Sequence, residues 1–123
     1  MATKKVLLVE DDDFLSDLIY RRMIAGKYEC IRASNGEDAI KLVAEQKPDT
    51  VLLDVLLPGI DGFEILRRLK AEESSRKIPV IFLSNLGQKD DLEKGKKLGA
   101  VKFLIKATVS PDEIFEEVAA ALA

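Results

Sequence analysis

The stretch TVLLDVLLPGIDG, residues 50–62, sets the expected fold of this 123-residue chain. Its apolar start, Val51 to Leu53, stops at the carboxylate Asp54, and Pro58 and Gly59 then turn the chain. A short apolar run that is bounded by a turn signal is typical of a strand buried on both faces of a parallel sheet. Asp54 is therefore expected at the carboxyl end of that strand, where open α/β sheets bind ligands.

A second acidic group follows the other strongly apolar run, Val6 to Val9. The four residues 10–13 are Glu-Asp-Asp-Asp. An Asp that closes a strand is more often a turn former or a helix cap than a reactive group. However, two strand ends with carboxylates in one small sheet are expected to be neighbours in space. Together they suggest a site for a hard cation.

Composition restricts the classes of function. The chain has 33% charged and 47% hydrophobic residues, and no apolar run is long enough to span a bilayer, so we expect one soluble domain over residues 1–123 without an effector domain. No apolar signal segment follows the first Met, which predicts a cytoplasmic location. A net charge of -3 without a basic stripe argues against direct binding of nucleic acid. The absence of histidine excludes Ser-His and Cys-His catalysis, and Cys30 is expected to be buried and inert.

Strand and helix patterns alternate five times along the chain. The expected strands cover residues 6–9, 28–32, 51–53, 78–84 and 101–106, and the expected helix starts are the pairs Ser34/Glu37, Asp61/Glu64 and Ser110/Glu113. Strands that alternate with crossover helices predict a doubly wound parallel sheet of the α/β class.

The fourth helix, residues 89–98, is expected to be the weakest. Its apolar residues are little more than Leu92 and Leu98. Gly95 in its interior costs about 1 kcal/mol relative to Ala. We therefore expect the segment 87–99 to be loosely held.

Polar residues gather at one edge of the predicted sheet. The carboxyl ends of the strands carry Glu10, Asp11, Asp54, Ser84 and Lys106. Taken alone, a Ser after a strand is usually a turn residue and a Lys is usually a solvated charge. Their occurrence together at one edge favours a functional site.

These motifs resemble the receiver domains of two-component response regulators, the CheY-like family, over essentially the whole chain. The matching stretches are LLVEDD, LLDVLLPGIDGFEILRRL, FLS and FLIK, at residues 7–12, 52–69, 82–84 and 103–106. The resemblance implies a flavodoxin-like fold with five helices around a five-stranded parallel sheet in the order 2-1-3-4-5.

The resemblance also implies a Mg²⁺-dependent phosphoacceptor. Asp54 is similar to the carboxylate that becomes an acyl phosphate. Asp11 resembles the direct magnesium ligand, Glu10 the acid that acts through a metal-bound water, and Leu56 the residue that lends its backbone carbonyl. Mg²⁺ suits such an all-oxygen site, because it offsets the repulsion between clustered carboxylates.

Three further residues resemble the family's switch. Lys106 is similar to the lysine that pairs with the phosphoryl oxygens, Ser84 to the hydroxyl that hydrogen-bonds one of them, and Phe103 to the aromatic residue whose packing reports the switch. Two positions depart from the family pattern, because Asn85 follows Ser84 where a small apolar residue is common, and Ala107 follows Lys106 where proline is usual. Receivers generally have a cis peptide after this lysine, so a cis bond is expected here if the site geometry imposes it.

The implied function is a stand-alone receiver, phosphorylated by a sensor histidine kinase, a histidine phosphotransfer protein or a small acyl phosphate. Phosphorylation would switch a protein-binding surface, on a monomer or a phosphorylation-dependent dimer, without turnover as an enzyme. A haloacid-dehalogenase-like phosphatase would need an Asp at position 56, and a flavodoxin-like nucleotide binder would not carry the acidic residues 10–13 in its first loop. A receiver-like binding module that is never phosphorylated remains the alternative.

Overall fold

The computed structural model describes residues 3–86 and 88–123, in which five strands alternate with five α-helices. The strands are β1 (Lys5–Val9), β2 (Glu29–Ala33), β3 (Thr50–Leu53), β4 (Val80–Ser84) and β5 (Lys102–Ile105). The α-helices are α1 (Asp13–Ala25), α2 (Gly36–Gln46), α3 (Gly62–Ala71), α4 (Lys89–Leu98) and α5 (Pro111–Leu122), and a short 3₁₀ helix covers Lys106–Thr108.

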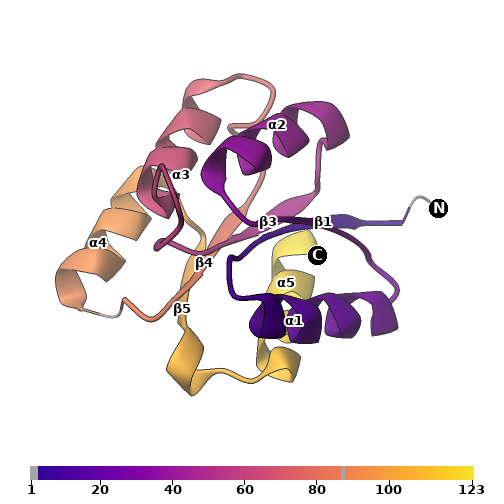
Figure 1. Cartoon of the computed structure of the whole chain (residues 1–123). Coiled ribbons are helices and arrows are strands. Elements are labelled where there is room, and N and C mark those ends of the chain that lie inside the picture. Colours follow the sequence, from indigo (N-terminus) through magenta and orange to yellow (C-terminus); the bar gives the residue numbers. More distant parts are fainter. Residues whose placement is uncertain (1–2, 87) are drawn as a thin grey trace.

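The strands form one parallel sheet in the order β2-β1-β3-β4-β5. Helices α2, α3 and α4 cover one face of the sheet, and α1 and α5 cover the other (Figure 1). This is the predicted flavodoxin-like, doubly wound α/β fold. The order places β1 and β3 side by side at the centre, so residues that follow these two strands emerge next to each other.

The two central strands are buried on both faces. In β1, Val6 and Leu8 belong to the apolar core under α1 and α5, whereas Leu7 and Val9 belong to the core under α2 and α3. All four side chains are 0–1% exposed. The continuous apolar runs in the sequence are explained by this arrangement, because a strand between two helical layers has no solvent face.

Helix starts agree with the predicted caps at two of three positions. The Ser110 hydroxyl accepts the Glu113 N–H and the Glu113 side chain accepts the Ser110 N–H, each at 3.1 Å, which completes a capping box. The Asp61 carboxylate accepts the Glu64 N–H at 2.9 Å. The predicted cap at Ser34 is wrong by one residue, because the Asn35 side chain caps α2 by accepting the Asp38 N–H at 2.9 Å.

Strand ends differ slightly from the prediction. β2 begins and ends one residue later than expected, β4 starts at Val80, and β5 lacks the expected end residues Val101 and Lys106. Lys106 instead opens the 3₁₀ helix, and the peptide bond to Ala107 is trans, so the site geometry does not impose the cis bond that receivers generally have at this position. Without proline, trans is the favoured form.

Helix α4 has the predicted bounds, and Gly87 of the expected loose segment lies outside the described residues. Gly95 is buried in this helix, and a Cβ there would meet the rings of Phe82 and Phe103 at 3.1 Å. From the sequence, this glycine was expected only to lower the helix propensity of the segment. The structure shows that it also lets α4 approach the aromatic residues of the sheet.

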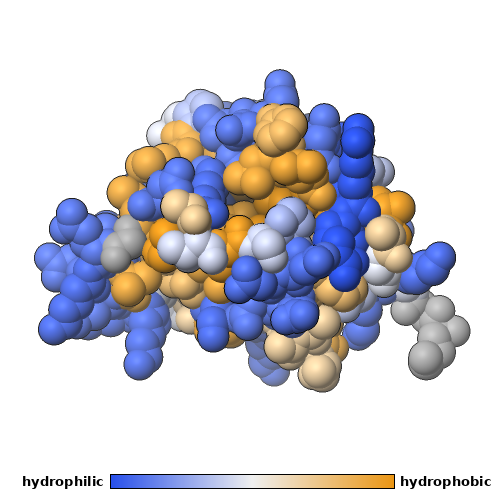
Figure 2. All heavy atoms as spheres, turned by 90° about the horizontal axis from the view of Figure 1, so that it is seen from below, coloured by the Kyte–Doolittle hydropathy of each residue, from blue (hydrophilic) through white to orange (hydrophobic). Residues whose placement is uncertain are grey.

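None of the described helices is long and apolar enough to cross a bilayer. The face shown in Figure 2 has hydrophilic residues at both ends and hydrophobic residues gathered between them. Large apolar side chains that are well exposed include Phe14, Leu56 and Val101.

Candidate functional site

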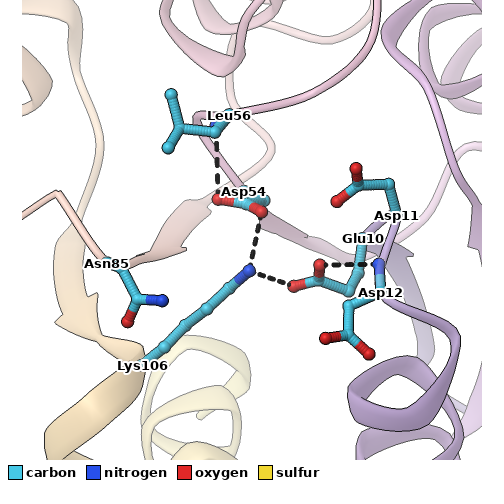
Figure 3. Close-up of a pocket in the computed structure, with 7 residues that line it drawn as sticks. All are labelled: Glu10, Asp11, Asp12, Asp54, Leu56, Asn85 and Lys106. Atoms are coloured by element: carbon cyan, nitrogen blue, oxygen red, sulfur yellow. Dashed lines mark hydrogen bonds and ion pairs between the residues drawn. The ribbon is translucent and has the colours of Figure 1, made fainter.

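An acidic pocket lies at the carboxyl edge of the sheet. Its volume is about 390 Å³, and the described residues that line it are Glu10, Asp11, Asp12, Asp54, Leu56, Asn85 and Lys106 (Figure 3). They follow β1, β3, β4 and β5, so residues far apart in the sequence meet here because the parallel strands all end at this edge. Four of the residues that the sequence places at this edge of the sheet therefore lie together in the pocket: Glu10, Asp11, Asp54 and Lys106.

The Lys106 ammonium lies between two buried carboxylates. Its Nζ donates a hydrogen bond of 2.7 Å to Asp54 Oδ2 and forms a 2.7 Å ion pair with Glu10 Oε1. The side chains of Asp54 and Glu10 are 4% and 1% exposed. Burial disfavours the charged ammonium, but the interactions with Asp54 and Glu10 outweigh burial and raise the pKa of Lys106. Lys106 therefore remains charged and offsets part of the negative charge of the pocket.

The two carboxylate oxygens of Glu10 have different partners. Its Oε2 accepts the Asp12 N–H at 3.0 Å. Its Oε1 is fully buried and forms the ion pair with the Lys106 ammonium. No other described residue donates to this oxygen. Burial raises the pKa of Glu10, against the lowering effect of Lys106 and the Asp12 N–H. The Lys106 ammonium, 2.7 Å away, is the positive partner of the buried Oε1.

The three carboxylates fit a divalent cation. One oxygen each from Glu10, Asp11 and Asp54 can be chosen so that all three lie within 4.8 Å of one another. Asp11 is exposed, whereas the other two are buried. Hard oxygen donors with an open, water-accessible side match the coordination preferences of Mg²⁺. Lys106 supplies one positive charge against the three carboxylates, so a divalent cation would offset the negative charge that remains.

The loop after Asp54 is held by a close contact with the start of α3. Gly62 N–H donates to Val55 O at 2.8 Å. A Cβ at position 62 would overlap the carbonyl oxygen of Asp54 and lie 2.8 Å from Val55 Cα. The Leu56 N–H donates to Asp54 Oδ1 at 3.3 Å and orients the carboxylate. Sequence reasoning missed Gly62, although a glycine directly after the helix cap Asp61 was a detectable signal.

Ser84 and Phe103 do not line the pocket. Ser84 is fully buried, and its hydroxyl accepts the Leu86 N–H at 3.3 Å. Phe103 is half-buried and packs against Phe82, with ring centroids 5.4 Å apart. The roles expected for Ser84 and Phe103 therefore stay predictions. Asp12 lines the pocket but also accepts the Leu15 N–H at 3.0 Å as the cap of α1.

A five-stranded doubly wound sheet with clustered carboxylates and a lysine at its carboxyl edge defines the class of receiver-like α/β domains. Residues 6–119 match the family model described as "Response regulator receiver domain". The chain belongs to this family, and the resemblance expected from its motifs is confirmed. It is accordingly a receiver domain of two-component response regulators, a class that interacts with histidine kinases and phosphotransfer proteins.

Similar proteins include both longer regulators and short receivers. The chain is 35% identical to the phosphate regulon transcriptional regulatory protein PhoB of Pseudomonas aeruginosa over 122 residues, which is 99% of this chain and 53% of that protein. It is also 35% identical to the sporulation initiation phosphotransferase F of Bacillus subtilis, over 86% of this chain and 84% of that protein. The chain thus spans about half of the first relative and most of the second. The prediction that it acts without an effector domain stays a prediction.

Among solved structures, the receiver domain of the sensor histidine kinase PA1611 from Pseudomonas aeruginosa is similar to this chain. The TM-score is 0.88 with 26% sequence identity, and the match covers 98% of each chain. That structure has a magnesium ion coordinated in its active-site cleft.

Proposed function

We propose that this receiver is a Mg²⁺-dependent phosphoacceptor whose modified residue is Asp54. The observation that carries the proposal is the placement of the buried Asp54 carboxylate, which lies 2.7 Å from the Lys106 ammonium and beside the carboxylates of Glu10 and Asp11. This arrangement offers a nucleophile, a fixed cation and a set of metal ligands within one pocket.

The cation site uses the residues assigned by resemblance. Asp11 and Asp54 would bind Mg²⁺ directly, the Leu56 backbone carbonyl would complete the protein ligands, and Glu10 would act through a bound water. The ion would neutralise charge on the carboxylates and on the incoming phosphoryl group.

Asp54 acts as the nucleophile in the proposed transfer. One of its carboxylate oxygens attacks the phosphorus atom, the bond from phosphorus to the donor breaks, and the donor leaves with that electron pair. The product is an acyl phosphate on Asp54. Lys106 donates to a phosphoryl oxygen, and its short bond to Asp54 keeps it within reach. The donor comes from outside, because the chain has no histidine.

The added charge is the proposed switch. A phosphoryl group carries nearly two negative charges and strong acceptor oxygens. It would draw the Ser84 hydroxyl away from the Leu86 N–H, and Phe103 and α4 would readjust with the loop between them. The readjusted surface would bind a downstream protein as a monomer or a phosphorylation-dependent dimer. The cytoplasmic location and the absence of enzymatic turnover belong to the same proposal.

An intact-mass measurement tests the proposal. With acetyl phosphate and millimolar Mg²⁺, the wild-type chain should gain one phosphoryl group, and Asp54→Ala should gain none. Asp11→Ala should slow transfer strongly because it removes a metal ligand, and Lys106→Ala should permit some labelling. If the wild-type chain stays unlabelled and also fails to bind beryllofluoride, or if Asp54→Ala still labels, the proposal is wrong. The constitutive binding module would then be the better description.

A further inference from the structure

Asn85 occupies the wall of the pocket that faces the acidic residues. It directly follows β4, and Figure 3 shows its side-chain amide directed toward the space beside Lys106 and Asp54, across from Glu10 and Asp11. Asn85 is exposed, so its side chain can contact a group that enters the pocket from solvent.

The pocket has few side chains that could hold an anion. Four of the described lining residues are acidic and one is Leu56. Among the described residues of this lining, Lys106 and Asn85 are the two whose side chains carry N–H donors. Lys106 is already shared between Asp54 and Glu10. Asn85 is therefore the second side chain of this lining that can donate to a phosphoryl oxygen.

The hydroxyl that the family resemblance assigns to this task is not in the pocket. Ser84 is fully buried and is not among the residues that line the pocket. Asn85 is the next residue in the chain, and it does line the pocket. In this conformation Asn85 presents the donor that Ser84 does not.

We propose that the Asn85 side-chain amide binds a phosphoryl oxygen on Asp54. The inference rests on the proposed function of Asp54 and adds a specific contact to it. The amide N–H donates to the anionic oxygen, which strengthens the bond relative to a neutral acceptor. Asn85 is thus a binding residue for the modified state.

Beryllofluoride, which imitates the phosphoryl group, tests the contact without any catalytic step. Its affinity in the presence of Mg²⁺ should fall roughly tenfold in Asn85→Ala, because a hydrogen bond to a charged group is lost. Asn85→Leu has nearly the shape of Asn but no donor, so its affinity should fall equally. Asn85→Asp should bind more weakly still, since it places a negative charge beside the anion.

Fluorine NMR of the bound beryllofluoride localises the effect. One fluorine resonance should shift in Asn85→Ala and Asn85→Leu, while those of fluorines held by the metal and by Lys106 stay near their wild-type positions. Thermal unfolding of each variant, expected to be close to wild type because Asn85 is exposed, excludes a general loss of structure.

The outcomes separate two kinds of failure. If the wild-type chain does not bind beryllofluoride, the proposed function of Asp54 is wrong. If the wild-type chain binds and both Asn85→Ala and Asn85→Leu match its affinity and spectrum, only the inference about Asn85 is overturned. If Asn85→Leu binds like wild type while Asn85→Ala does not, Asn85 fills space and is not a donor.

Discussion

Helices α3 and α4 lie side by side on one face of the sheet and have the same length, but they are held in different ways (Figure 1). α3 buries four large apolar side chains and begins at the Asp61 cap, whereas the one residue of α4 that is buried is Gly95. Gln88 is the N-cap residue of α4, and its side chain makes no capping hydrogen bond. The comparison shows that one layer of this fold combines a firmly anchored helix, next to the Asp54 loop, with a helix that rests on aromatic rings.

The largest expected difference between the two helices is in the cost of removing an apolar side chain. Leu66 in α3 is 0% exposed and Leu92 in α4 is 37% exposed. Leu66→Ala should lower the free energy of unfolding by about 2–5 kcal/mol through lost burial and a cavity. Leu92→Ala should lower it by less than about 1 kcal/mol. Urea unfolding followed by circular dichroism measures both, and equal losses would contradict the comparison.

The buried glycines of the two helices should also respond differently. Gly62→Ala forces a Cβ against the backbone of Asp54 and Val55, which cannot yield as a side chain can, so it should cost roughly 1–3 kcal/mol. Gly95→Ala gains about 1 kcal/mol of helix propensity, and the rings of Phe82 and Phe103 at 3.1 Å need to move only slightly. Its net effect should be near zero. A Gly95→Ala loss as large as that of Gly62→Ala, in the same unfolding assay, would show that α4 is anchored as firmly as α3.

A third, smaller difference concerns local opening. Amide protons of α4 should exchange faster than those of α3, because α4 has few buried side chains to hold its hydrogen bonds. Beryllofluoride with Mg²⁺ should change the protection of residues 89–98 more than that of residues 62–71. Hydrogen exchange read by mass spectrometry measures both segments in one sample, and Asp54→Ala is the control. Equal protection, unchanged by the ligand, would refute the idea that α4 is the mobile part.

The smallest effect concerns a surface ion pair on α3. Hydrogen bonds from Arg67 and Arg68 lower the pKa of Glu64 from 4.5 to about 2. Since the pKa in the folded state is depressed, this contribution is present above about pH 4.5 and is lost as the pH falls toward 2. The pair is exposed, so its effect on overall stability should be slight. An NMR titration of the Glu64 carboxyl should have its midpoint near 2, and a midpoint at 4 or above would show that the pair does not form in solution.

The element order was predictable because the chain alternates two clear periodicities. The caps at Asp61 and Ser110 were predictable because each is a good capping residue with Glu three positions later. Ser34 was mistaken for the cap of α2 because Ser34 and Asn35 are both good caps, and apolar periodicity does not distinguish adjacent positions.

The candidate site was predictable to the extent that strand ends determine it. Glu10, Asp11, Asp54 and Lys106 meet because parallel strands end at one edge. The burial of Ser84 behind the pocket depends on a side-chain orientation and a loop, which no sequence pattern specifies. Gly95 packs against the rings of Phe82 in β4 and Phe103 in β5. Helix propensity depends only on the local sequence and therefore does not predict this contact.

The contact between α1 and α5 carries a constraint of a different kind. Phe115 of α5 stacks on Tyr28 with ring centroids 5.3 Å apart and lies under the Arg22 guanidinium, and a Cβ at Gly26 would overlap its ring. Positions 26 and 115 therefore compete for the same volume. Among homologues we expect covariation, in which a side chain at position 26 accompanies a smaller residue at position 115. Gly26→Ala combined with Phe115→Leu should accordingly fold better than Gly26→Ala alone.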